Sequence, residues 1–184
     1  MKLIKLGPNH IYGQCIISDT YKICFILIPK NMSSTMRNFI KNNLNGYLYN
    51  YFLCTPEQKE YFTFCICRDI KKRFYSAINT ILVRKKNDIS EMNNLNMNLY
   101  VENMVDEHLV EQTKFIKDIK IDMLVNIEKI SKYFTVMNES NKCIENKFNI
   151  NDEVIMDIYK DDIEIYEQSK DMDLDKFLKI LNIK

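Results

Sequence analysis

The sequence predicts an α/β fold in which a small, mostly parallel central sheet is flanked by helices in three layers. Two apolar runs, Ile23–Ile28 and Tyr61–Cys67, have the length of strands. Neither run alternates with polar residues, which is typical of strands buried on both faces of a parallel sheet. Each run is followed within a few residues by apolar positions at helical spacing. With 184 residues, we expect one domain spanning 1–184.

The segments around the first apolar run can be assigned in order. Before it, we expect extended pieces, one of them near Ile11–Ile17, separated by a turn at residues 7–9. After it, a helix should end at Gly46, which would supply a left-handed cap. Its apolar stripe consists of Met36, Phe39, Ile40 and Leu44. The aromatic-rich segment Tyr47–Leu53 is a further strand candidate.

A second helix is predicted to start at Ile70, directly after the second apolar run. Its buried face should hold Ile70, Phe74, Ala77, Ile78, Ile81 and Leu82. Its basic residues are expected on the opposite face: Lys71, Lys72, Arg73, Arg84, Lys85 and Lys86. The last three of them are interpreted as a solvated basic surface. Beyond it, the pattern predicts a loop or lid with a short helical piece at 87–105, a helix at 106–119, a strand at 121–127, a short helix to about 136, a polar loop at 138–149, and helices at 151–166 and 173–181.

Composition narrows the class of protein. The formal net charge of +1 gives no basic field that would favour nucleic acid. The longest apolar run is too short to span a membrane, and the N-terminal residues do not form a signal peptide, so we expect a soluble, cytoplasmic protein. The six cysteines are interpreted as reduced structural thiols. Cys65 and Cys67 are too closely spaced for a zinc site, and no metal site is predicted.

The loop between the first apolar run and its helix is a candidate phosphate site. A helix N-terminus presents unpaired N–H groups and the positive end of the helix dipole. Here those groups would be joined by one lysine and three hydroxyl residues. The residues of this cradle are Pro29, Lys30, Asn31, Met32, Ser33, Ser34 and Thr35. The plain alternative is an ordinary strand-loop-helix joint with a serine or threonine cap.

Five segments follow the motif order of one family. Ile28–Thr35 resembles the 5′-phosphosulfate loop of carbohydrate-type sulfotransferases that use 3′-phosphoadenosine 5′-phosphosulfate (PAPS). Cys67–Ala77 resembles their R-D-P-x-x-R-F-x-S-A motif for the 3′-phosphate, with isoleucine in place of the proline. The weaker matches are His108–Gln112 to an H-x-x-P-Q segment, Asp122–Glu128 to a strand ending in an acidic residue, and Tyr159–Asp162 to a Y-x-x-D helix. The resemblance implies a P-loop-like three-layer fold and sulfuryl transfer from PAPS, without a metal, to an acceptor hydroxyl, with a carbohydrate as the acceptor that the family favours.

Specific roles follow for the residues of these motifs. Lys30 would stabilise charge on the transferring group, and Arg68 supplies the bidentate fork that suits the second phosphate. Ser76 would donate a hydroxyl to the same phosphate. The carboxyl ends of adjacent parallel strands meet at one edge of a sheet, so the two clusters should lie together there.

The general base and the activity itself leave alternatives open. His108 is the best candidate base, because the ordinary pKa range of histidine suits removal of a proton from the acceptor hydroxyl. The predicted catalytic residues are therefore Lys30 and His108. Glu57, Glu60 and Glu107 are the acidic alternatives. The chain could also be a non-catalytic nucleotide-binding or interaction protein of the same fold. A nucleotide kinase is a weaker alternative, because three scattered glycines cannot form a glycine-rich phosphate loop.

Overall fold

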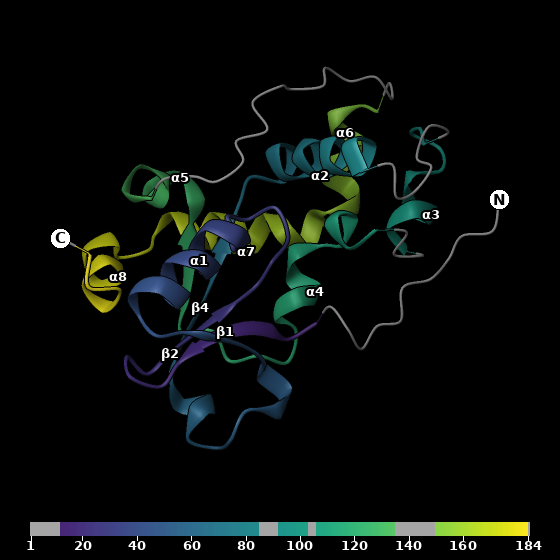
Figure 1. Ribbon diagram of the computed structural model, residues 1–184. Coiled ribbons are helices and arrows are strands. Elements are labelled where there is room, and N and C mark those ends of the chain that lie inside the picture. Colours follow the sequence, from purple (N-terminus) through teal and green to yellow (C-terminus); the bar gives the residue numbers. More distant parts are fainter. Residues whose placement is uncertain (1–11, 85–91, 103–105, 135–149, 184) are drawn as a thin grey trace.

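The computed structural model describes residues 12–84, 92–102, 106–134 and 150–183 (Figure 1). Five strands form one sheet with the order β3-β1-β2-β4-β5. Their bounds are β1 Gln14–Ser18, β2 Ile23–Ile26, β3 Tyr47–Asn50, β4 Phe62–Cys67 and β5 Met123–Asn126. The helices are α1 Ser33–Asn43, α2 Ile70–Arg84, α3 Met97–Glu102, α4 Gln112–Ile116, α5 Ile127–Ile130, α6 Asp152–Ile158, α7 Lys160–Lys170 and α8 Leu174–Ile180. Short 3₁₀ turns are η2 Tyr51–Leu53, η3 Gln58–Glu60, η4 Glu107–Leu109 and η5 Ser131–Tyr133.

The α/β class is confirmed, but the prediction of a mostly parallel sheet is wrong because the sheet is mixed. Strand β4 runs parallel to both β2 and β5. Strand β1 runs antiparallel to both β2 and β3. The reason is the short connection between Ser18 and Ile23, which closes a turn but cannot make the crossover that parallel neighbours require.

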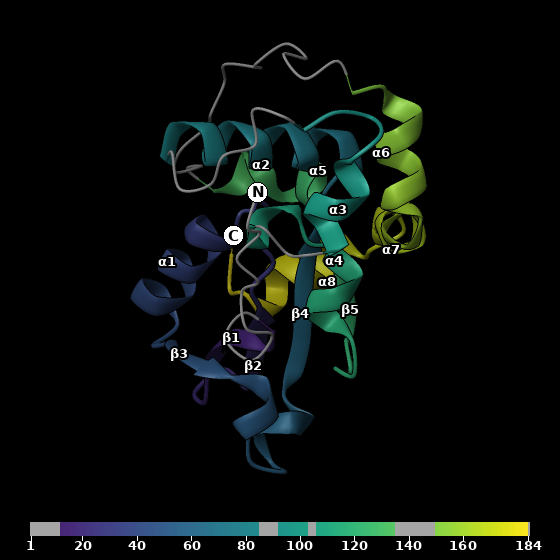
Figure 2. The same cartoon turned by 90° about the vertical axis from the view of Figure 1, so that its right-hand side faces the viewer.

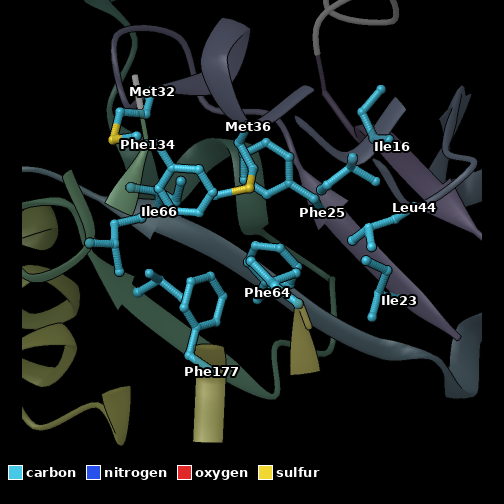
Figure 3. Packing of buried hydrophobic residues seen from close by; sticks show 14 of the residues in the cluster. Ile16, Ile23, Phe25, Met32, Met36, Leu44, Phe64, Ile66, Phe134 and Phe177 are labelled. Carbon is cyan, nitrogen blue, oxygen red and sulfur yellow. The ribbon is translucent and has the colours of Figure 1, made fainter. Parts of the chain in front are cut away.

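Strands β2 and β4 are buried on both faces, as their continuous apolar sequences predict. In β2, Ile23 and Phe25 belong to one core cluster, whereas Cys24 and Ile26 belong to another. On the first face, α1 and α8 cover the sheet, and Phe64 lies between two other rings. Its ring centroid is 5.1 Å from that of Phe25 and 5.2 Å from that of Phe177 (Figure 3). The first pair is stacked and the second is edge-to-face, and together they join the sheet to the last helix.

The opposite face of the sheet is covered by a different set of elements. Side chains from η2, α4 and α7 pack there against the alternate residues of β1, β2 and β4. Figure 2 shows α1 and α7 on opposite sides of the strands. A further cluster, built from α2, α3, η4, α6 and the start of α7, lies beyond the carboxyl end of β4. The helices therefore enclose the edge of the sheet at which β2 and β4 end.

The end of α1 differs from the prediction in one residue. The left-handed position after the helix is held by Asn45, with φ 52°. Gly46 follows it and donates its N–H to the carbonyl of Ile40 at 3.0 Å. A Cβ atom on Gly46 would lie 2.6 Å from Cγ2 of Ile40 and 2.9 Å from Cγ2 of Ile16. Glycine is needed there because the chain packs closely, not because of its backbone angles.

Three predicted elements are each divided in two. The strand predicted at 47–53 becomes β3 and η2, the helix at 106–119 becomes η4 and α4, and the helix at 151–166 becomes α6 and α7. The turn at 7–9, the polar loop at 138–149, Cys143 and parts of the predicted lid lie outside the described residues. In the described part, Cys15, Cys24, Cys54, Cys65 and Cys67 are free and buried. No helix within those ranges is long and apolar enough to cross a membrane.

Candidate functional site

The loop between β2 and α1 contains two residues in the left-handed region of backbone conformation. Lys30 and Met32 both adopt left-handed conformations, with φ 69° and 56°. Such a conformation costs a non-glycine residue about 1 kcal/mol or more and is concentrated at functional sites. Met32 is the N-cap of α1 and forms no side-chain cap, and the first turn holds no acidic residue. The ordinary serine- or threonine-capped joint is therefore not what the chain forms, and the helix N-terminus favours an anion.

Arg68 lies beside this loop, at the carboxyl end of the neighbouring parallel strand β4. Its Nη1 donates to the carbonyl oxygen of Lys30 at 2.9 Å. Burial lowers the pKa of Arg68, although the guanidinium stays charged near neutral pH. Among the described residues Arg68 forms no ion pair with a carboxylate. Its charge is thus half-buried, held against a neutral carbonyl and suited to an anionic ligand.

Lys30 extends from its loop to the second helix rather than over the start of α1. Its Nζ donates to Oγ1 of Thr80 at 2.7 Å. The Thr80 hydroxyl donates in turn to the carbonyl oxygen of Ser76 at 3.0 Å. Ser76 itself is half-buried on α2. The structure therefore brings Lys30 beside the turn of α2 that carries Ser76, and next to Arg68.

Arg73 is buried beside the loop before α1, so the prediction that it lies on the face of α2 opposite the buried one is wrong. Only 2% of it is exposed, and its Nε donates to the carbonyl oxygen of Pro29 at 3.2 Å. Its Nη2 is buried without a hydrogen-bond partner among the described residues. Burial lowers the pKa of Arg73, an effect opposed by the nearby carboxylate of Asp162. The sequence does contain an indication of this burial. Arg73 lies three residues after Ile70 and four before Ala77, and this spacing places it on the apolar side of α2.

A buried polar network joins the two loops from inside. The Asn31 amide nitrogen donates to the carbonyl of Ile66 at 2.6 Å and also to Oε1 of Gln112. Gln112 accepts from the N–H of Arg68 and donates to its carbonyl, each at 3.1 Å. The Asp162 carboxylate accepts the N–H groups of Gln112 and Thr113 at 2.8 and 2.9 Å. Burial raises the pKa of Asp162, and Arg73 opposes that shift.

Not every residue of the predicted cradle presents its side chain to a ligand. Asn31, Met32 and Thr35 are buried, and Met32 belongs to the core under α1 (Figure 3). Ser33 is half-buried and Ser34 is exposed. The Asn31 N–H already donates to the carbonyl of Ile28 at 3.3 Å, so a ligand contact from the buried residues would come from the backbone of Met32 or Thr35.

His108 is buried in η4, which packs against α2. The Asp106 carboxylate accepts the backbone N–H of His108 at 2.9 Å and also contacts Nδ1 of its ring. This contact fixes the ring and leaves Nε2 as the nitrogen that could accept a proton. The acidic alternatives Glu57 and Glu60 lie before β4, at the other end of a strand about 20 Å long. They pair with Lys22 and Lys120 respectively, whereas Glu107 lies next to His108 in η4.

The described residues contain no group of three or more histidine, cysteine, aspartate or glutamate side chains placed to hold a metal ion. Comparison with known proteins adds no relative. No protein-family model, no curated protein and no solved structure matches this chain. A function is therefore proposed from the geometry of the site and the motif resemblance.

Proposed function

We propose that this protein is a sulfotransferase with a P-loop-like three-layer fold. It would move a sulfuryl group from PAPS to an acceptor hydroxyl, and a carbohydrate is the favoured acceptor. The observation that carries the proposal is the contact between Arg68 and the carbonyl of Lys30. It joins two cationic loops at the ends of adjacent parallel strands. This edge is where ligands bind in open α/β sheets.

The side chains fit a ligand that carries negative charge at two separated places. The uncapped start of α1 would receive the 5′-phosphosulfate through backbone N–H groups. Arg68 and the Ser76 hydroxyl would receive the 3′-phosphate, because a guanidinium binds phosphate through two parallel hydrogen bonds. The left-handed Lys30 and Met32 support the assignment, since backbone strain of this kind is typical of ligand-binding turns.

Sulfuryl transfer forms one bond to sulfur, from the acceptor, and breaks another, to the donor. The acceptor oxygen attacks the sulfur, the bond from sulfur to the bridging phosphate oxygen breaks, and adenosine 3′,5′-bisphosphate leaves. The Lys30 ammonium would leave the Thr80 hydroxyl and offset the charge that grows on the leaving oxygen. The proton of the acceptor hydroxyl would pass to Nε2 of His108, whose ring Asp106 holds in place.

Product formation tests the proposal directly. The protein is incubated with isotope-labelled PAPS and a panel of carbohydrate, phenolic and lipid hydroxyls, and products are analysed by mass spectrometry. A labelled sulfated product that is lost in Lys30→Ala but kept in Lys41→Ala, an exposed lysine of α1, supports sulfotransferase activity. Bisphosphate binding without any sulfated product would favour the non-catalytic binding protein. Transfer from a nucleoside triphosphate instead would favour the kinase.

A further inference from the structure

We propose that Gln112 is a positioning residue that holds the two anion-binding loops at a fixed separation. The inference rests on the proposed function, because it assumes that both loops bind one ligand. Gln112 is fully buried and makes no contact with solvent. It acts through the loop residues that it touches.

One side chain reaches both loops at once. The Oε1 of Gln112 accepts the N–H of Arg68, and its Nε2 donates to the carbonyl of the same residue. The Gln112 amide therefore binds both polar groups of the Arg68 backbone. The same Oε1 accepts from the amide of Asn31, in the loop before α1. Buried hydrogen bonds of this kind are costly to break, because each partner would be left unsatisfied.

This clamp, the Gln112 side chain with its hydrogen bonds to Arg68 and Asn31, is held in place by a helix that is distant in the sequence. The Asp162 carboxylate in α7 accepts the backbone N–H of Gln112 at 2.8 Å. It also accepts the N–H and the hydroxyl of Thr113, at 2.9 and 3.1 Å. The position of Gln112 is thus set by α7 and does not depend on a bound ligand.

Fixed separation matters only for a ligand that spans both loops. A nucleotide with one phosphate can occupy its loop wherever that loop lies. Adenosine 3′,5′-bisphosphate must reach both loops together, so a clamp that sets their spacing lowers the cost of ordering on binding. Loss of the clamp should therefore weaken bisphosphate binding much more than monophosphate binding.

Affinity ratios test this in the full-length protein. Calorimetry measures adenosine 3′,5′-bisphosphate, adenosine 5′-monophosphate and adenosine 3′-monophosphate against wild type, Gln112→Met and the matched control Gln168→Met on exposed α7 surface. We expect bisphosphate affinity to fall about tenfold more than either monophosphate affinity in Gln112→Met, and not in the control. Equal losses for all three ligands in a folded variant would overturn the inference. Asn31→Ala, which breaks one link of the clamp, serves in its place if Gln112→Met does not fold.

A readout without ligand separates this inference from the proposed function. Arg68 follows the last residue of β4, yet its N–H is bonded to Gln112. Amide hydrogen exchange should show that the backbone N–H of Arg68 is protected in the unliganded wild type. The same N–H should exchange faster in Gln112→Met. Unprotected exchange at Arg68 in the wild type would refute the clamp. Failure of the wild type to bind bisphosphate would refute the proposed function and the role given to the clamp, while leaving the Gln112–Arg68 contact itself to the exchange result.

Discussion

Replacing Arg68 with alanine should weaken binding of adenosine 3′,5′-bisphosphate by about 30- to 150-fold. The guanidinium is half-buried, and its hydrogen bond within the described chain is to a neutral carbonyl. Its charge is therefore available to a phosphate and only partly screened by water. A charge-assisted hydrogen bond of this kind contributes about 2–3 kcal/mol, and about 1.4 kcal/mol corresponds to a tenfold change in affinity.

Isothermal titration calorimetry measures this loss, with Arg37→Ala as the matched control because Arg37 is exposed on α1. The control should bind as the wild type does. Circular dichroism melts establish that Arg68→Ala is folded, since it also loses the bond to the Lys30 carbonyl. An unaltered dissociation constant in the folded variant would place the 3′-phosphate elsewhere and refute the assignment of Arg68.

Four further outcomes are expected. Lys30→Ala should lower the rate of sulfuryl transfer by about two orders of magnitude or more with a smaller loss of nucleotide affinity, because its contribution grows in the transition state; single-turnover kinetics compared with calorimetry decides this. His108→Ala should leave nucleotide affinity nearly intact and cut the rate about a hundredfold, and full activity would exclude it as the base. Burial raises the pKa of Asp162 in the folded protein, so this group adds stability as pH falls through its folded pKa toward about pH 4. Urea titrations at several pH values should show that this gain in the free energy of unfolding is absent in Asp162→Asn. Phe64→Ala should lower the free energy of unfolding by about 3–5 kcal/mol, and a loss below about 1 kcal/mol in urea titration would contradict its central place in the core.

Local patterns in the sequence predicted the elements well, but not the direction of every strand. Continuous apolar runs located β2 and β4, and helical spacing located α1 and α2. The continuous apolar runs belong to β2 and β4, which do pair in parallel. They do not give the direction of β1 and β3, which pair antiparallel. The informative feature was the short spacing between Ser18 and Ile23, which permits a turn and excludes a crossover.

The candidate site was predictable where it depends on adjacent strands and not where it depends on distant contacts. Parallel pairing of β2 and β4 brings Arg68 to Lys30, as the two strand-loop-helix units suggested. Arg73 was grouped with its neighbours by charge, although its angular position on the helix faces the core. The carboxylate of Asp162 meets Gln112 from 50 positions away, and no local periodicity encodes such a contact.

The most direct test of the account is the thermal stability of the unmodified protein with adenosine 3′,5′-bisphosphate, compared with adenosine, which lacks both phosphates. A ligand that binds only the folded state stabilises it by about 2.7 kcal/mol at a hundredfold excess over Kd. For a chain of this length, that predicts a rise in Tm of about 5–10 °C. The account predicts this rise with the bisphosphate and none with adenosine. An unchanged Tm at millimolar bisphosphate would contradict the claim that the two loops form one nucleotide site.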